Sequence, residues 1–224
     1  FEQVVVDLCL HNLPVRLIGN GGGLVYAPLG PTHLAIEDMG ILRTVPNMTI
    51  VAPTDAEEMR RFMPETLKTE GPVYIRLAKG GDPIVSRDED GFVIGKSIEL
   101  RPGKDVAVIS IGVMANRALS AAEALSHQGI ECAVINMHTL KPLDDEEVLS
   151  LARRFSLIVT LEEHVLKGGL GSAVAELLMD RHEGRMPALK RIGLPDSFPN
   201  DYGSQDSMME NFGLQPQAIE ASIK

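Results

Sequence analysis

Short apolar runs alternate with segments of helical periodicity along this chain, and the alternation occurs in two blocks. In the first block the apolar runs lie at 15–18, 48–53 and 73–77, and apolar residues recur at helical spacing over 1–12 and 33–44. The runs are rich in Val, Ile and Leu, as in strands that are buried on both faces. The first block therefore predicts three parallel strands connected by helices.

The second block continues the pattern. The predicted strands are 106–110, 131–136, 157–161 and a last one near 189–192, and the predicted helices are 114–127, one from Asp144, one from Gly171-Ser172, and a terminal helix with Met208 and Met209 on its packed face. Strands and helices that alternate in this way form parallel sheets with helices on their faces. The predicted fold class is α/β, with two open, mostly parallel-sheet units.

One helix has a start signal in the sequence itself. Thr54 is followed three residues later by Glu57, which is the spacing of a capping box. The signal predicts that a helix begins directly after the strand at 48–53.

The two blocks are separated by a segment with little apolar periodicity. This segment contains KGGDP, the acidic run RDEDG and RPGKD. Clusters of Gly, Pro and charged residues of this kind are typical of connecting segments. We therefore predict a first domain at 1–84, a linker at 85–104 and a second domain at 105–224.

The composition narrows the classes of partner. The formal net charge is 21 − 31 = −10, so the surface should repel nucleic acid and anionic membranes. Cys9 and Cys132 are isolated and predict neither a disulfide framework nor a zinc site, which favours a reducing, cytoplasmic location. No apolar run is long enough to span a bilayer. The chain begins at Phe1 rather than Met, so we expect further residues in front of it.

A glycine-rich loop follows the first predicted strand and ends in Gly30-Pro31-Thr32-His33. Glycines let a backbone approach a ligand closely, and a histidine at the start of a helix can contact a polar or anionic group and exchange a proton near neutral pH. A tight structural turn with a capping histidine is the alternative. The spacing of Gly19 and Gly21 does not complete a GxGxxG fingerprint, because Leu24 occupies the last position.

The surrounding sequence resembles a known family. The segment GPTHLAIEDMGILRTVPNMTIVAPTDAEEM (30–59) resembles the pyrimidine-binding domain of transketolases, and the later half resembles the C-terminal domain of that family, most closely in deoxyxylulose-phosphate synthases. The matching pieces of the later half are GKDVAVISIG (103–112), INMHTLKPLD (135–144), VTLEEHVLKGGLGSAV (159–174), IGLPDSF (192–198) and FGLQPQAIEASIK (212–224). The resemblance implies a partial pyrimidine-binding domain followed by a transketolase C-terminal domain.

The resemblance also implies roles for four residues. His33 would be the catalytic residue beside thiamine and the donor sugar, and Gly30 and Thr32 would contact the cofactor. Lys79 falls where the family holds the substrate phosphate, and a lysine suits that role as a compact point charge. The alternative for Lys79 is a solvated linker lysine.

Three positions depart from the family pattern. Leu29 stands where an acid usually hydrogen-bonds a substrate hydroxyl, and Gly21 and Gly22 stand where transketolases carry a His and deoxyxylulose-phosphate synthases an Arg. A buried hydroxyl without a partner costs about 1–3 kcal/mol. The resemblance therefore leaves the identity of the small-molecule substrate open.

The resemblance further implies thiamine diphosphate and Mg²⁺ as cofactors, but the Gly-Asp-Gly motif that holds them is absent from this sequence. GGDP at 80–83 does not match it, and the glutamate that activates the cofactor would lie before Phe1. We therefore expect the diphosphate and metal ligands on an N-terminal part or a partner subunit, and no metal ligands in this chain. Glu162-Glu163-His164 and the glycines after it favour a strand-to-helix turn, with the acids on a solvated or subunit-facing edge.

Three functions remain open at this point. The first is part of a thiamine-diphosphate-dependent transketolase-like transferase that acts on ketose or keto-acid substrates, is incomplete by itself and assembles as a homodimer or larger. The second is the β subunit of a 2-oxo acid dehydrogenase E1 component. The third is a non-catalytic assembly or regulatory module with the same fold.

Overall fold

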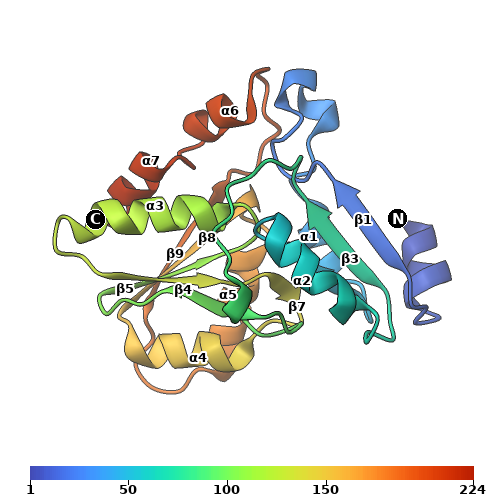
Figure 1. The fold of residues 1–224 in the computed structure, drawn as a ribbon, viewed down its shortest axis with the longest axis horizontal. Helices are drawn as coiled ribbons and strands as arrows, with labels where there is room; N and C mark the ends of the chain where they lie inside the picture. The colour runs from blue at the N-terminus through green and yellow to red at the C-terminus, as the bar shows by residue number, and fades with distance from the viewer.

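Two sheets organise the computed structural model, which describes all residues 1–224 (Figure 1). The first sheet has the order β1-β3-β2-β7, and its strands are β1 (Arg16–Asn20), β3 (Val73–Leu77), β2 (Thr49–Val51) and β7 (Thr139–Lys141). The second sheet has the order β4-β6-β5-β8-β9, and its strands are β4 (Ile98–Arg101), β6 (Cys132–Asn136), β5 (Val106–Ser110), β8 (Leu157–Val165) and β9 (Ala188–Leu194). The predicted α/β class with two mostly parallel sheets is confirmed.

The parallel strands pair as the apolar pattern predicts. β3 lies between β1 and β2 and is parallel to both, with Val73 opposite Arg16 on one side and Thr49 on the other. β5, β6, β8 and β9 are likewise parallel. β5 and β6 are buried along their whole length because helices cover both faces of their sheet.

Helices cover the two faces of the second sheet in separate groups (Figure 1). The helices of the chain are α1 (Asp38–Arg43), α2 (Ala56–Thr66), α3 (Met114–Ser126), α4 (Asp145–Arg154), α5 (Leu170–Arg181), α6 (Gln205–Asn211) and α7 (Pro216–Ile223), and a π-helical segment, Val4–Cys9, precedes β1. One apolar cluster holds buried residues of α3, α6 and α7, and another holds those of α4 and α5. None of these helices is long and apolar enough to cross a membrane.

The two units share one core and one sheet. The cluster that contains Leu151 of α4 and Ile109 of β5 also contains Met39 and Ile50 of the first unit. β7 leaves the second unit and pairs antiparallel with β2. The predicted linker at 85–104 contains β4, which pairs antiparallel with β6. The units are therefore packed as one body rather than joined only by a tether.

Two predicted helix starts are wrong. The helix predicted from His33 begins at Asp38, because Leu34 is extended and Ala35 bridges to the backbone of Gly22 and Gly23. The capping interaction predicted from Thr54 is shifted by one residue. Asp55 is the N-cap of α2, and its carboxylate accepts the N–H of Glu58 at 2.9 Å.

Candidate substrate and cofactor site

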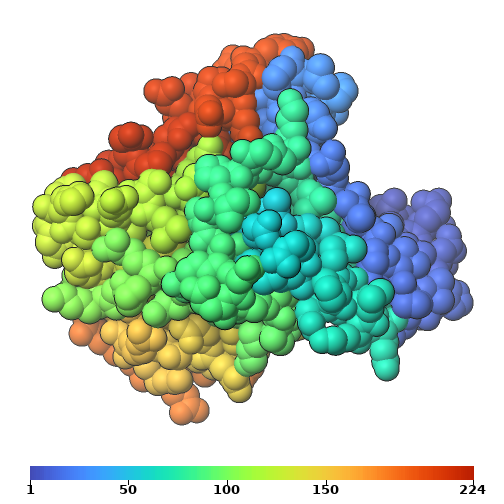
Figure 2. All heavy atoms as spheres, viewed as in Figure 1, coloured from blue at the N-terminus to red at the C-terminus, as the bar shows by residue number.

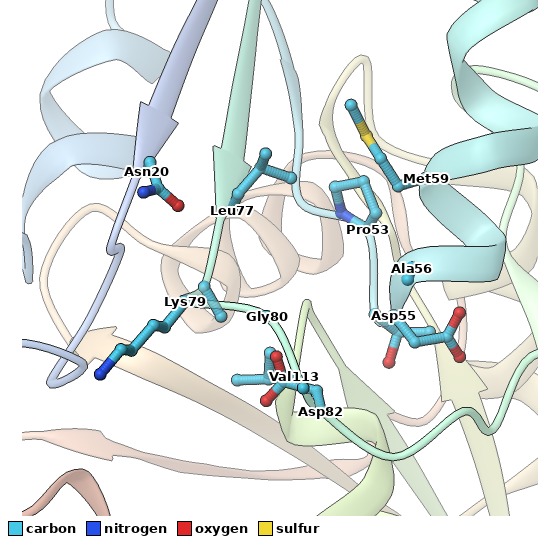
Figure 3. Close-up of a pocket in the computed structure, with 13 residues that line it drawn as sticks. Asn20, Pro53, Asp55, Ala56, Met59, Leu77, Lys79, Gly80, Asp82 and Val113 are labelled. Atoms are coloured by element: carbon cyan, nitrogen blue, oxygen red, sulfur yellow. The ribbon is translucent and has the colours of Figure 1, made fainter.

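A pocket lies at the edge where β1, β2 and β3 end. Its volume is about 220 Å³, and its lining includes Asn20 at the end of β1, Pro53 after β2, Leu77 at the end of β3 and Lys79 after it (Figure 3). Ligands of open α/β sheets bind outside the carboxyl ends of the strands, since loops and helix starts converge there. The fold therefore forms its candidate substrate pocket at the expected edge.

Lys79 is exposed at the rim of this pocket. Its side chain extends away from Asp55 and Asp82, which line the opposite part of the same pocket (Figure 3). The ammonium group is therefore free to meet an anionic group of a ligand. Its role as a phosphate-binding residue remains a prediction.

Asp55 has a structural task in the pocket wall. Its carboxylate accepts the N–H groups of Glu58, Val85 and Ser86 and the Ser86 hydroxyl, at 2.7–2.9 Å. Burial opposes the charge of Asp55, but these hydrogen bonds outweigh burial and lower its pKa. Burial raises the pKa of the other pocket acid, Asp82. The pocket thus contains the exposed cation of Lys79 and two carboxylates, of which that of Asp55 is held by hydrogen bonds within the protein.

The residues predicted to contact the cofactor lie on a separate loop. Ala27–Leu29 and Pro31–His33 form two 3₁₀ turns that meet at Gly30, whose φ of 79° favours glycine. Thr32 and His33 are exposed, and the Thr32 hydroxyl lies 3.0 Å from His33 Nδ1. None of these residues lines the pocket of Lys79. The structure places both groups after strands of the first sheet without bringing them into contact.

The departures at Gly21 and Gly22 have a steric cause. A Cβ on Gly22 would lie 2.7 Å from Arg76 Nε, and one on Gly21, where φ is +87°, would overlap the Tyr26 ring. Both glycines are buried. The loop therefore takes a path that leaves no room for a side chain at either position.

Arg76 is the buried charge beneath that loop. Its Nε lies 3.0 Å from Asp38 Oδ2, and its Nη2 donates to the carbonyls of Ala35 and Glu163 at 2.9 Å each. Tyr74 donates its hydroxyl to Asp38 at 2.7 Å, and burial together with Asp38 raises its pKa. The sequence signal for this network was an arginine inside an apolar strand, VYIRL.

The strand-to-helix turn expected after Glu162-Glu163-His164 is confirmed between β8 and α5, but the expectation that the acids lie on a solvated or subunit-facing edge is wrong. The three residues are at most 1% exposed and lie at the end of β8 rather than on a solvated edge. Glu162 accepts the N–H groups of Leu170 and Gly171 at 2.7 and 2.8 Å, at the start of α5. Burial raises the pKa of Glu162 to about 7. Tertiary packing covers these acids, which an element-by-element interpretation does not anticipate.

The buried contact between Glu58 and Asn136 was not predicted. Glu58 accepts the N–H of Thr54 at 2.6 Å and the amide of Asn136 at 2.7 Å, and so joins α2 to the end of β6. Burial raises the pKa of Glu58 to about 7. In sequence Glu58 is one of several acids in a helix start, and nothing there distinguishes it from its exposed neighbour Glu57.

The family models identify both halves of the chain. Residues 1–81 match the model "Transketolase, pyrimidine binding domain", and residues 95–219 match "Transketolase, C-terminal domain". The chain belongs to the transketolase family. No group of three or more His, Cys, Asp or Glu residues is arranged to hold a metal ion.

Curated relatives agree with this assignment. The 1-deoxy-D-xylulose-5-phosphate synthase of Rippkaea orientalis is 42% identical over 229 residues, which covers 100% of this chain and 35% of the relative. The 6-deoxy-6-sulfo-D-fructose transketolase subunit SqwH of Clostridium sp. (strain MSTE9) is 38% identical over 218 residues, with 97% and 66% covered. The chain thus spans about a third of the length of the first relative and two thirds of the second.

Solved structures show the same fold. A split gene transketolase described as an inactive β4 tetramer aligns with a TM-score of 0.90 at 36% identity, over 100% of this chain and 70% of that chain. A transketolase from Pichia stipitis aligns with a TM-score of 0.75 at 18% identity, over 96% of this chain and 30% of that one. These similarities favour a transketolase-type subunit over the β subunit of a 2-oxo acid dehydrogenase and over a non-catalytic module.

Proposed function

We propose that this chain is one part of a thiamine-diphosphate-dependent, transketolase-like transferase and that it supplies the pyrimidine side of the cofactor site together with a substrate-anion subsite. The observation that carries the proposal is the pocket at the ends of β1, β2 and β3, with Lys79 at its rim, in a chain of the transketolase family. The Gly30–His33 turns belong to the same unit.

Within this proposal the two groups of site residues have different tasks. Lys79 binds the anionic end of a ketose substrate, for which a point charge without a bidentate fork is sufficient. His33 exchanges or stabilises a proton at the reacting carbonyl end, since it is exposed and an imidazole can act as a general acid or base. Thr32 orients that imidazole through its hydroxyl, and Gly30 would contact the cofactor through its backbone.

The cofactor would be shared between parts of the assembly. When bound, thiamine diphosphate would supply the nucleophilic and electron-accepting chemistry for two-carbon transfer. The exposed Thr32 and His33 suit contact with the uncharged end of the cofactor. Magnesium and the diphosphate would be held by another segment or a partner subunit, as the naming of SqwH as a subunit and the description of a split transketolase suggest. The proposal includes a homodimer or larger assembly. It also includes a cytoplasmic location, which the free thiols of Cys9 and Cys132 favour.

The substrate class follows from the charge at the pocket rim. The names of two relatives specify a sugar phosphate and a sulfo-sugar. Lysine can pair with a phosphate or a sulfonate, because either presents negatively charged oxygens. We therefore propose a ketose with a terminal oxyanion group, and direct competition between the two types would identify the preferred one.

Reconstitution tests the proposal. The chain is co-expressed with a transketolase diphosphate-binding subunit, and the purified complex is assayed for bound thiamine diphosphate and for ketol transfer. We expect stoichiometric cofactor in the complex, and a lower kcat but unchanged cofactor content for His33→Ala. Sedimentation of the same sample reports the assembly state. A complex that forms but neither holds the cofactor nor transfers a two-carbon unit would favour the non-catalytic module.

A further inference from the structure

The loop at 21–33 has little structure of its own. Its only regular elements are two three-residue 3₁₀ turns, and its glycines lose more backbone entropy on ordering than other residues do. A loop of this composition keeps one conformation only if groups outside it fix its backbone. The Leu77 carbonyl of the first unit accepts the N–H groups of Gly21 and Gly22 at the start of the loop, and further fixing groups come from the second unit.

Glu163 holds the beginning of the loop. Its Oε1 accepts the backbone N–H of Leu24 at 2.7 Å and the side-chain amide of Gln205 at 2.9 Å. The carboxyl group is pressed against Gly23, where an added Cβ would overlap it. Glu163 is 1% exposed, so the hydrogen bond to Leu24 is shielded from water.

His164 holds the helix that follows the loop. Its Nε2 accepts the N–H of Gly40 in α1 at 3.1 Å, while Nδ1 donates to the carbonyl of Val165 at 2.6 Å. This pair of contacts requires the neutral ring, and burial lowers the pKa of His164 accordingly. Glu163 and His164, which are consecutive residues of β8, thus hold the loop and the helix that follows it.

Tyr202 covers the middle of the loop. Its ring packs on Gly30, where an added Cβ would lie 2.5 Å from a ring carbon, and the neighbouring Gly203 N–H donates to the carbonyl of Ala27 at 3.4 Å. Figure 2 shows this C-terminal segment, in orange-red, against the blue loop at one end of the molecule. Tyr202 is 70% exposed, so it contributes little to the hydrophobic core.

We propose that Glu163, His164 and Tyr202 are positioning residues through which the C-terminal unit sets the conformation of the loop at 21–33 and thereby of Thr32 and His33. The proposal rests on the proposed function only in treating this loop as part of an active site. It gives the C-terminal unit a task in the reaction although none of its side chains lines the pocket of Lys79 apart from Val113.

Hydrogen–deuterium exchange of the full chain, read by mass spectrometry, tests the proposal. In Glu163→Ala we expect the amides of residues 22–30 to exchange about tenfold faster or more, because the Leu24 contact is lost and the loop opens locally. Amides of β5 and β6 should keep their exchange rates. Glu163→Gln should restore the wild-type pattern, since its amide oxygen can accept both existing hydrogen bonds.

Glu162→Ala is the matched control, because Glu162 is an equally buried neighbour of the same type whose hydrogen bonds run to the start of α5 and not to the loop, with its carboxylate 3.8 Å from His164 Nδ1. It should accelerate exchange at residues 168–172 and leave the loop unchanged. Unchanged loop exchange in a folded Glu163→Ala, or the same segments opening in both alanine variants, would overturn the proposal. If Glu163→Ala does not fold, Tyr202→Ala decides, since its side chain is exposed. Faster exchange at residues 27–33 would support the proposal, and wild-type exchange there would contradict it.

Activity of the reconstituted enzyme provides the second measurement. Glu163→Ala and Tyr202→Ala should lower kcat with the substrate KM within about twofold of wild type, because they displace His33 rather than Lys79. Glu163→Gln should recover kcat. A parallel loss of all activity and protein would indicate only instability. If no assembly is active but loop exchange responds as expected, the proposed function fails and the positioning role stands.

Discussion

The carboxyl edges of the two parallel sheets serve different purposes. In the first unit the strands end at a solvent-accessible pocket, and Lys79 and His33 are exposed after them. In the second unit β6 and β8 end in the buried side chains of Asn136, Glu163 and His164, which bind α2, the loop and α1 of the first unit. The same edge of the same sheet type can therefore hold a ligand or hold another part of the protein.

The difference follows from what each edge faces. Strand ends bring polar groups together in any parallel sheet, and those groups need partners when they are buried. The edge of the second sheet lies against the first unit, so its polar groups are satisfied by protein atoms. The edge of the first sheet is covered only in part, and the exposed Lys79 there is available to a ligand.

Arg76 lies where the two edges meet, and its replacement should break the arrangement most strongly. Arg76→Met leaves Asp38 buried without its cation and frees two carbonyls, which should lower the free energy of unfolding by about 3–5 kcal/mol. Urea denaturation followed by circular dichroism measures the change in the free energy of unfolding. Arg60→Ala, which removes only exposed ion pairs, should leave the midpoint unchanged. Equal urea midpoints for the two variants would show that the ion pair between Arg76 and Asp38 does not stabilise the contact between the two units.

Glu58 should make the contact between α2 and β6 sensitive to pH. Its folded-state pKa of about 7 lies above the ordinary 4.5, so its stabilising contribution is complete below pH 4.5 and is lost as the pH rises through 7. The loss amounts to about 3 kcal/mol from this shift. Glu58→Gln should remove it, because Asn136 can turn its unpaired Oδ1 toward the new amide.

Thermal unfolding of wild type and Glu58→Gln at pH 5, 6, 7 and 8 checks this, and the two curves should separate as the pH rises. Glu57→Gln, on the exposed side of the same helix, should follow wild type. Parallel curves for wild type and Glu58→Gln would mean that Glu58 is ionised throughout this range.

Replacement of Lys79 tests whether the pocket at the strand ends of the first sheet binds an anionic substrate. In the reconstituted enzyme Lys79→Ala should raise KM for anionic substrates and lower kcat/KM by about ten- to a hundredfold, since a charge-assisted contact contributes about 1.5–3 kcal/mol. Cofactor content should not change. Steady-state kinetics measures the effect, with Lys68→Ala as a control for an exposed lysine outside the pocket. Normal kinetics for Lys79→Ala would leave it a solvated lysine.

Gly22 tests how tightly the loop is pressed onto the first unit. Gly22→Ala brings a methyl group 2.7 Å from Arg76 Nε, and the overpacking should lower stability by about 1–3 kcal/mol. Gly203→Ala is the control, since its methyl group meets chiefly the exposed Ser207 side chain, which can rotate. Chemical denaturation should separate the two variants, and equal stability would contradict a tightly packed loop.

The sequence by itself determined the α/β class, the parallel strands and the family. Runs such as VAVIS and CAVIN are apolar at successive positions and form strands that are buried along their whole length. It also placed Lys79 directly after a strand, which is where the pocket lies. These features are local in the chain, so their physical causes can be inferred from neighbouring residues.

Only the tertiary structure decided which polar residues are buried and what they bind. Glu57 and Glu58 are adjacent acids in one helix start, yet only Glu58 meets Asn136, 78 residues later. Glu163 was expected at a solvated or subunit-facing edge and instead accepts the N–H of Leu24, 139 residues away in the sequence. Burial of a charge depends on which distant backbone amides and guanidinium groups reach it, and those distances are set by the packing of the two units.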